Sequence, residues 1–153
     1  MNKKTLLTVI GILAGTVAFA ASDFTNGWVP TSGEISSKHA TAYSRSKDKM
    51  ILKGIEGKDW TMFYSFQIKS EPGKKAVITF SASGKGKVFA GYFGYITGFT
   101  FKRTEEKPLN LTEKPQQFSL EFPIVKDVNI IRPKFRMTPG SEVEITNFKA
   151  EIK

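Results

Sequence analysis

The alternation of apolar and polar residues with a period of two is the feature that most limits the folds open to this chain. It recurs from Asp23 onward, whereas no stretch keeps apolar residues at helical spacing over three turns. In residues 118–124, for example, Ser119, Glu121 and Pro123 separate four large apolar side chains. This pattern predicts an all-β protein built from short, half-buried strands.

The predicted strands are separated by segments whose composition is typical of turns. We expect strands at residues 49–56, 60–68, 75–82, 87–96, 99–103, 118–124, 128–137 and 142–152, with a further one near residues 24–29. Segments rich in Gly or Pro lie at residues 71–73, 83–86, 105–108 and 138–141. Eight or more short strands joined in this way indicate a sandwich or a barrel.

Residues 1–20 have the pattern of a cleavable export signal. Lys3 and Lys4 precede a short apolar stretch, and Ala18-Phe19-Ala20 offers the small residues after which signal peptidase cuts. The stretch is shorter than the ~20 residues of a comfortable membrane span, although tilting could extend it into an uncleaved anchor. We therefore expect cleavage after Ala20, a secreted or periplasmic protein and no stable membrane anchor.

The remaining residues 21–153 are of a size for one domain with one core. The chain has no cysteine, so disulfides and thiolate chemistry are excluded and packing alone must hold the fold together. Loss of Lys3 and Lys4 leaves 21 basic residues against 14 acidic ones. The surplus favours anionic partners, among them acidic glycans, although it could equally serve solubility alone. Because the lysines are dispersed, no nucleic-acid partner is expected.

The order of several segments resembles the jelly-roll β-sandwich of carbohydrate-binding modules, a galactose-binding-like fold. They are Asn26-Gly27-Trp28 and the stretches 49–54, 59–69, 76–82 and 139–148. The resemblance implies an antiparallel jelly roll without catalytic residues that binds sugars through aromatic and polar side chains. It also implies a structural calcium near the chain termini. Asn147 argues against the ion, because the pattern tends to place an acidic residue there.

Candidate binding residues come from two predicted strands. If Val88, Ala90 and Tyr92 face the core, Phe89, Phe93 and Tyr95 share the other face, with Gly91 between the rings. Burial of both faces or a bulge at the glycines would remove this patch. Flat aromatic faces of this kind can stack on sugar rings.

The second strand would add cations to the same face. If Ile131 and Phe135 pack inward, Arg132, Lys134 and Arg136 point outward, where Arg132 and Arg136 could bind carboxylates or sulfates, or simply be solvated. Phe63 and Gln67 would join if their strand lies alongside. The predicted site is therefore Phe63, Gln67, Phe93, Tyr95, Arg132 and Arg136.

Nothing in the sequence singles out a catalytic or metal site. His39 is the only histidine, and no pair of acids stands out as the two carboxylates of a glycosidase. We therefore expect an exported, non-catalytic carbohydrate-binding protein without a cofactor. The alternatives are a structural or protein-interaction module of the cell envelope, with a protein partner, and a small hydrolase.

Overall fold

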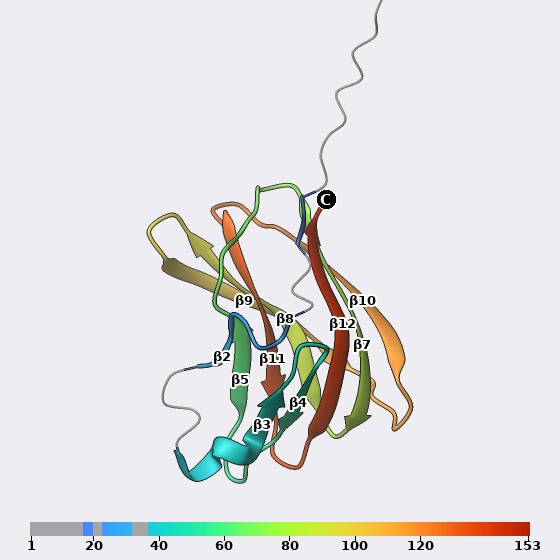
Figure 1. The fold of residues 1–153 in the computed structure, drawn as a ribbon. Coiled ribbons are helices and arrows are strands. Elements are labelled where there is room, and N and C mark those ends of the chain that lie inside the picture. Colours follow the sequence, from blue (N-terminus) through green and yellow to red (C-terminus); the bar gives the residue numbers. More distant parts are fainter. Residues whose placement is uncertain (1–16, 20–22, 32–36) are drawn as a thin grey trace, which may run out of the picture.

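Two antiparallel β-sheets face each other in the computed structural model, which describes residues 17–19, 23–31 and 37–153 (Figure 1). The first sheet contains β1 (Val17–Phe19), β3 (Tyr43–Arg45), β4 (Lys49–Lys53), β7 (Lys75–Lys85), β10 (Gln116–Pro123) and β12 (Glu142–Ile152). The second contains β2 (Trp28–Pro30), β5 (Trp60–Tyr64), β6 (Ile68–Lys69), β8 (Val88–Ile96), β9 (Thr100–Leu109) and β11 (Ile130–Met137). A short 3₁₀ helix, η1 (Ser37–Ala42), precedes β3.

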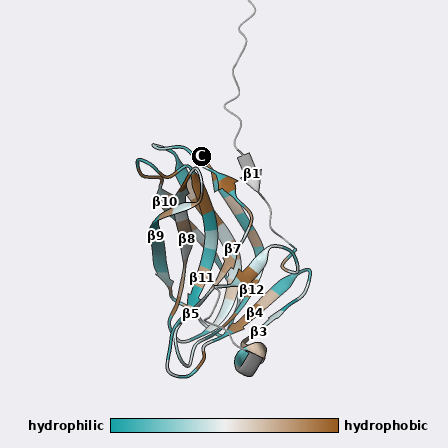
Figure 2. Cartoon of the chain, turned by 90° about the vertical axis from the view of Figure 1, so that its left-hand side faces the viewer, coloured by the Kyte–Doolittle hydropathy of each residue, from teal (hydrophilic) through white to brown (hydrophobic). Residues whose placement is uncertain are grey.

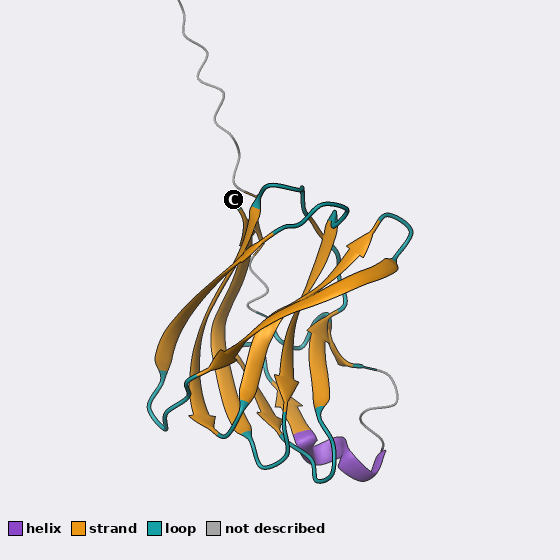
Figure 3. Cartoon of the chain, turned by 180° about the vertical axis from the view of Figure 1, so that it is seen from behind, coloured by secondary structure: helices purple, strands orange, loops and turns teal. Residues whose placement is uncertain are grey.

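The chain passes repeatedly from one sheet to the other, so strands that are neighbours in sequence are often not neighbours in space. The first sheet has the order β10-β7-β12-β4-β3, with β1 also pairing with β12. The second has the order β2-β5-β11-β8-β9, with β6 pairing with β11. Seen from behind, β8 and β9 form a long twisted hairpin across the sandwich (Figure 3). The predicted antiparallel β-sandwich is confirmed.

The core lies between the sheets and is rich in aromatic rings. Trp28 is fully buried, and its ring centroid lies 4.9 Å from that of Phe148 and 5.7 Å from that of Phe135. Phe80 reaches Phe135 from the opposite sheet at 5.2 Å. Each buried ring removes about 150–250 Å² from water, which lets this part of the chain form a core by packing alone. Hydrophilic and hydrophobic positions alternate along the strands, as the period of two requires (Figure 2).

A bulge in β12 changes which side chains face the core. Val143 and Ile145 point inward, but so does Phe148, three residues further on. The register with β7 shifts between Thr146 and Lys149, and Asn147 adopts a φ of 53° there. The extra residue moves the inward positions from odd to even numbers, so that Phe148 reaches Trp28.

Two predictions about strand boundaries are wrong. The predicted strand at residues 60–68 ends at Tyr64, and Phe66 is 47% exposed. Phe63 is paired with Lys134 of β11, and Ile68 is paired with Ile131. The four residues between Phe63 and Ile68 therefore lie opposite only two residues of β11, one of which is Pro133. Pro133 carries no N–H for the ladder, and the chain bows away from β11.

The second wrong boundary is the turn predicted at residues 105–108, which lies inside β9. β9 is the outermost strand of its sheet, where one side needs no ladder bonds and a proline such as Pro108 is tolerated. This correction matters for the site, because it places Glu106 on a strand beside β8.

Candidate functional site

The outer face of the second sheet gathers aromatic and basic side chains from four strands. On β11 the core takes Ile131 and Phe135, which leaves Arg132, Lys134 and Arg136 on the opposite side. On β8 the core takes Val88, Ala90 and Tyr92, all fully buried. We call the outer side the aromatic–basic face; it consists of Phe63, Phe89, Phe93, Tyr95, Phe99, Phe101, Arg132, Lys134 and Arg136.

The strand register determines which of these side chains are neighbours. Arg136 of β11 is paired with Phe89 of β8, and Arg132 is paired with Phe93. Between them, Lys134 is paired with Gly91, which in turn is paired with Glu106 of β9. Two cations of β11 therefore lie beside rings of β8, whereas Lys134 lies in a row with Gly91 and Glu106.

Aromatic rings on the face contact one another edge to face. The centroid of Phe93 lies 5.9 Å from that of Phe63 and 6.2 Å from that of Phe101, and Tyr95 lies 5.8 Å from Phe101. These are favourable separations for aromatic pairs. Phe101 is 54% exposed and Phe99 is 52% exposed. The β8–β9 end of the face thus offers large apolar rings to solvent.

Each of the three cations on β11 lies over at least one of these rings. The guanidinium of Arg136 lies 3.8 Å from the ring centroid of Phe89, and the ammonium of Lys134 lies 5.0 Å from that of Phe93. Attraction between a cation and the electron-rich face of a ring stabilises such pairs, most strongly where water is excluded.

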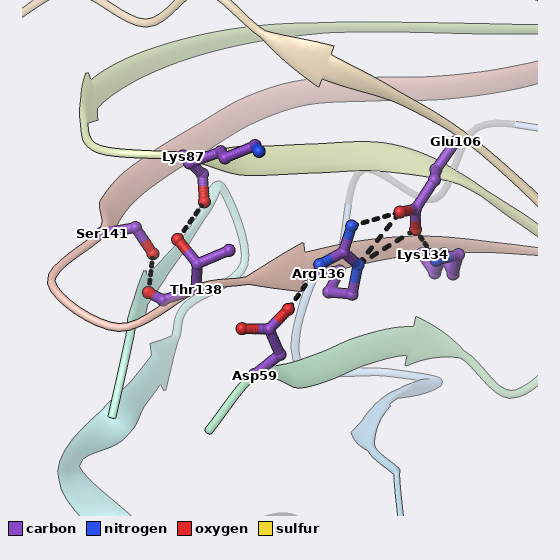
Figure 4. Close-up of polar contacts among 7 residues, drawn as sticks. All are labelled: Asp59, Lys87, Glu106, Lys134, Arg136, Thr138 and Ser141. Atoms are coloured by element: carbon purple, nitrogen blue, oxygen red, sulfur yellow. Dashed lines mark hydrogen bonds and ion pairs between the residues drawn. The ribbon is translucent and has the colours of Figure 1, made fainter. Parts of the chain in front are cut away.

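Acidic side chains neutralise two of the cations (Figure 4). Glu106 accepts hydrogen bonds from Lys134 and from Arg136, whose Nε lies 3.0 Å from Glu106 Oε1. Arg136 also pairs with Asp59, with 2.5 Å between Nη1 and Oδ2. The side chain of Lys134 is only 2% exposed, so its charge depends on Glu106 for compensation.

The protonation of this cluster follows from its contacts. Burial acts to raise the pKa of Glu106, but hydrogen bonds from Arg136 and Lys134 outweigh it and hold the pKa below its ordinary value. The hydrogen bond to Glu106 likewise raises the pKa of Arg136. Glu106 and Arg136 are therefore charged at neutral pH.

Gly91 makes the contact between Lys134 and Glu106 geometrically possible. It lies between them in the same cross-strand row, and the backbone of β9 fills the space where its side chain would lie. A Cβ at this position would come within 1.8 Å of the carbonyl oxygen of Glu105. Glycine is therefore required for β9 to approach β8 this closely.

Arg132 differs from the other two cations of the face. Its guanidinium lies 5.1 Å from the ring centroid of Tyr95 and 5.2 Å from that of Phe99. No hydrogen bond or ion pair joins it to any other residue within the described ranges. Its Nε is buried without a hydrogen-bond partner there. Arg132 is thus held by rings and presents an uncompensated charge.

Hydrogen bonds hold the turn that follows β11. The hydroxyl of Thr138 donates to the carbonyl oxygen of Lys87 at 2.7 Å, and that of Ser141 donates to the carbonyl oxygen of Thr138 at 2.5 Å (Figure 4). These contacts tie the Arg136 end of β11 to the beginning of β8 and so fix the neutralised end of the face.

The structure brings together five of the six predicted site residues. Phe63, Phe93, Tyr95, Arg132 and Arg136 all lie on the aromatic–basic face. Gln67 does not, because it falls in the segment between β5 and β6. It lines a cavity of about 630 Å³ with Thr97, Asn129 and others, and none of the five lines that cavity.

Six residues of the face or its ion-pair cluster were missing from the sequence-based site: Phe89, Phe99, Phe101, Lys134, Asp59 and Glu106. Phe99 and Phe101 follow the aromatic stretch of β8 after a short hairpin, and that proximity in sequence was an available signal. Lys134 was recognised as outward-facing but was not assigned to the site. Nothing in the sequence around Glu106 pointed to a role in the site, because its contacts depend on the pairing of β9 with β8.

The described part of the chain offers neither a cluster of metal ligands nor a membrane-spanning helix. No three histidine, aspartate or glutamate side chains there converge into a group that could hold a metal ion. None of its helical segments is long and apolar enough to cross a membrane.

Comparisons with solved structures show which proteins share this architecture. The family 11 carbohydrate-binding module of a cellulosomal cellulase from Clostridium thermocellum superposes with a TM-score of 0.59 at 15% identity, covering 90% of this chain and 95% of that one. The fold is an antiparallel jelly-roll sandwich. No protein-family model and no curated protein sequence matches this chain.

Enzymes share the architecture as well. A cyclase from Fischerella sp. TAU, solved with an indole ligand, has a TM-score of 0.62 at 10% identity, covering 89% of this chain and 88% of that one. The enzymatically active domain of bacteriophage CBA120 tailspike protein 4 has a TM-score of 0.59 at 11% identity, covering 90% of this chain. This chain spans only 18% of the tailspike chain. At these identities the likeness shows the fold alone.

Proposed function

We propose that this protein is an exported, non-catalytic carbohydrate-binding protein that holds a glycan on the aromatic–basic face. One observation carries the proposal. Two large rings are more than half exposed: Phe101 of β9, which contacts Tyr95, and Phe99 of the β8–β9 turn, which lies against Arg132. Exposed rings in a group are unusual on a protein surface and mark interaction sites. The fold shared with carbohydrate-binding modules supports sugars as the ligand class.

Recognition would combine stacking with polar contacts. The C–H faces of a sugar ring would pack on Phe101 and Tyr95, while Arg132 would bind polar groups at the ring edge. Tyr95 and Phe101 belong to paired strands, and their edge-to-face contact restrains both rings. Little conformational entropy is then lost on binding.

Ionisation of the face supports a binding role over a catalytic one. A glycosidase needs a carboxylic acid whose pKa is raised so that it can protonate the leaving group. Glu106 lies beside β8 in the row that contains Lys134, and hydrogen bonds from Arg136 and Lys134 lower its pKa instead. Its oxygens are occupied by these two cations, which leaves it poorly suited to donate or accept a proton during a reaction.

Two phenylalanines provide a matched test of this proposal. Phe101 on the face and Phe66 away from it are 54% and 47% exposed, so their replacement by alanine removes similar apolar surface. We would screen residues 21–153 on a broad glycan array and then measure the affinity for a selected oligosaccharide by titration calorimetry. We expect Phe101→Ala and Tyr95→Ala to weaken binding about tenfold or more, because burying a large apolar side chain is worth about 1.5–3 kcal/mol.

Phe66→Ala should bind the same oligosaccharide as tightly as the unchanged protein. Equal losses in Phe66→Ala and Phe101→Ala would show that the aromatic–basic face is not the site. A blank array from protein with a cooperative thermal transition would overturn the carbohydrate proposal itself.

A further inference from the structure

Three cations project from β11 onto the same face, and their surroundings differ in a way that suggests a role. Lys134 and Arg136 each contact Glu106, and Arg136 also contacts Asp59. Arg132 has no such acid among the residues that the structure describes. The charges of Lys134 and Arg136 are therefore compensated by acids, whereas the Arg132 end of the row of cations carries a net positive charge.

The surroundings of Arg132 fix the side chain without using its hydrogen-bonding edge. The ring centroids of Tyr95 and Phe99 lie 5.1 and 5.2 Å from its guanidinium carbon. Aromatic contact restrains the guanidinium without using its N–H groups as hydrogen-bond donors, which leaves them available to a ligand. Its Nε is buried with no acceptor among the described residues, which is a costly arrangement unless a ligand or water supplies one.

Phe99 adds a second, independent observation. It has a φ of 64°, in the left-handed region that a bulky residue rarely adopts, and it follows a turn in which its own N–H donates to the carbonyl oxygen of Ile96 at 3.1 Å. Despite this backbone strain the ring is 52% exposed and lies against Arg132. Strain kept at an exposed ring beside an unpaired cation is typical of a binding site.

We propose that Arg132 is an anion subsite that binds the carboxylate or sulfate of an acidic sugar. The guanidinium would donate two parallel hydrogen bonds to the oxyanion while the same sugar packs on Tyr95 and Phe101. The inference rests on the proposed glycan-binding function and adds the ligand class to it. Arg136 would not do the same, because Glu106 and Asp59 already occupy its fork.

The test uses pairs of probes that differ only in charge. One pair is tetragalacturonate and its fully methyl-esterified form; the other is a galactan tetrasaccharide with and without O-sulfation. Each would be titrated into residues 21–153 at low and at physiological salt. We expect the charged member of at least one pair to bind about tenfold more tightly, as charge-assisted hydrogen bonds predict, and this advantage to shrink with added salt.

Variants separate Arg132 from the general positive field of the protein. Arg132→Gln should abolish the advantage of the charged probe over its neutral counterpart, so that the two members of a pair bind this variant equally. Arg132→Lys keeps the charge but loses the fork, so it should retain only part of the advantage. Lys114→Gln removes one charge from an exposed position and should behave as the unchanged protein does. A cooperative thermal transition would establish that each variant is folded. If Arg132→Gln does not fold, Arg132→Lys serves as the test.

Several outcomes would overturn the inference. Equal binding of charged and neutral probes would refute the anion subsite while leaving glycan binding intact. Equal losses in Lys114→Gln and Arg132→Gln would show that only overall charge matters. Absence of binding to every sugar, charged or neutral, would instead remove the proposed function on which the subsite depends.

Discussion

At the scale of single residues, Glu106 controls the charge balance of the aromatic–basic face. It is the acid that compensates Lys134, whose side chain is almost completely buried. Its pKa lies below the ordinary value despite burial, so ionised Glu106 stabilises the folded state. This contribution is complete above the pKa of the unfolded chain and is lost as the pH falls through the lower pKa of the folded protein.

Replacing Glu106 should therefore destabilise the protein in a pH-dependent way. We expect Glu106→Gln to lower the free energy of unfolding at neutral pH by about 3 kcal/mol, because the buried Lys134 would lose the carboxylate with which it pairs. The difference from the unchanged protein should narrow as the pH falls below about 4.5, the ordinary pKa of the group. Urea denaturation at a series of pH values measures both effects.

Glu105→Gln is the matched control, because it removes the same charge one residue earlier. Glu105 pairs with Arg103, which is 43% exposed, and exposed pairs contribute at most about 1 kcal/mol. A loss in Glu105→Gln as large as that in Glu106→Gln would contradict the assigned role of Glu106.

Single residues also show what sequence reasoning can reach. The outward positions of Phe93, Tyr95, Arg132 and Arg136 follow from alternation within one strand, and the structure places them as predicted. Glu106 could not be found in this way, because its partners lie 28 and 30 residues further along the chain. Gln67 was placed on the face by extending alternation past Tyr64, where β5 ends.

At the scale of elements, the bulge in β12 joins two stretches whose inward positions are out of phase. Asn147 provides the extra residue, with a φ of 53°, and its side-chain nitrogen lies 3.3 Å from the hydroxyl oxygen of Ser81. Asparagine tolerates this conformation better than most residues. Ile145 and Phe148 both face the core although they are three positions apart in the sequence. This spacing was a signal for the bulge, because a strand with a uniform period of two would not place both residues inward.

Substitution at Asn147 should report on the bulge. We expect Asn147→Val to lower the free energy of unfolding by about 1–2 kcal/mol, because a β-branched residue is strained at positive φ. Asn147→Gly loses the same contact with Ser81 but is free of that strain, so it should be clearly more stable than the valine variant. Equal stability of the two variants by thermal unfolding would show that the backbone conformation does not limit substitution there.

At the scale of the whole molecule, alternation and turn composition predicted a sandwich or a barrel, and the resemblance to carbohydrate-binding modules predicted the jelly-roll sandwich. The two sheets and the comparisons confirm the latter. The predicted signal lies largely outside the described residues. Of that segment, the structure describes β1, which pairs with Ala150–Ile152 of β12. Cleavage after Ala20 would remove β1 and leave this edge of β12 without that neighbour.

Export can be tested by following the N-terminus. We expect protein recovered from the periplasm or medium of an expressing bacterium to have the intact mass of residues 21–153. Ala20→Leu should block cleavage, because signal peptidase requires a small residue before the cut, whereas Ala14→Leu enlarges the apolar stretch and should be processed normally. Recovery of the full-length chain in a soluble cytoplasmic fraction would contradict the predicted signal.

The row of cations on β11 also gives the aromatic–basic face a direction. Its Arg136 end is closed by Glu106 and Asp59, and its Arg132 end is open. A linear glycan likewise has two different ends, one reducing and one non-reducing. If the same glycan bound in the opposite orientation, its charged group would lie over an acidic side chain instead of over Arg132. The protein would then read the orientation of a sugar chain as well as its composition.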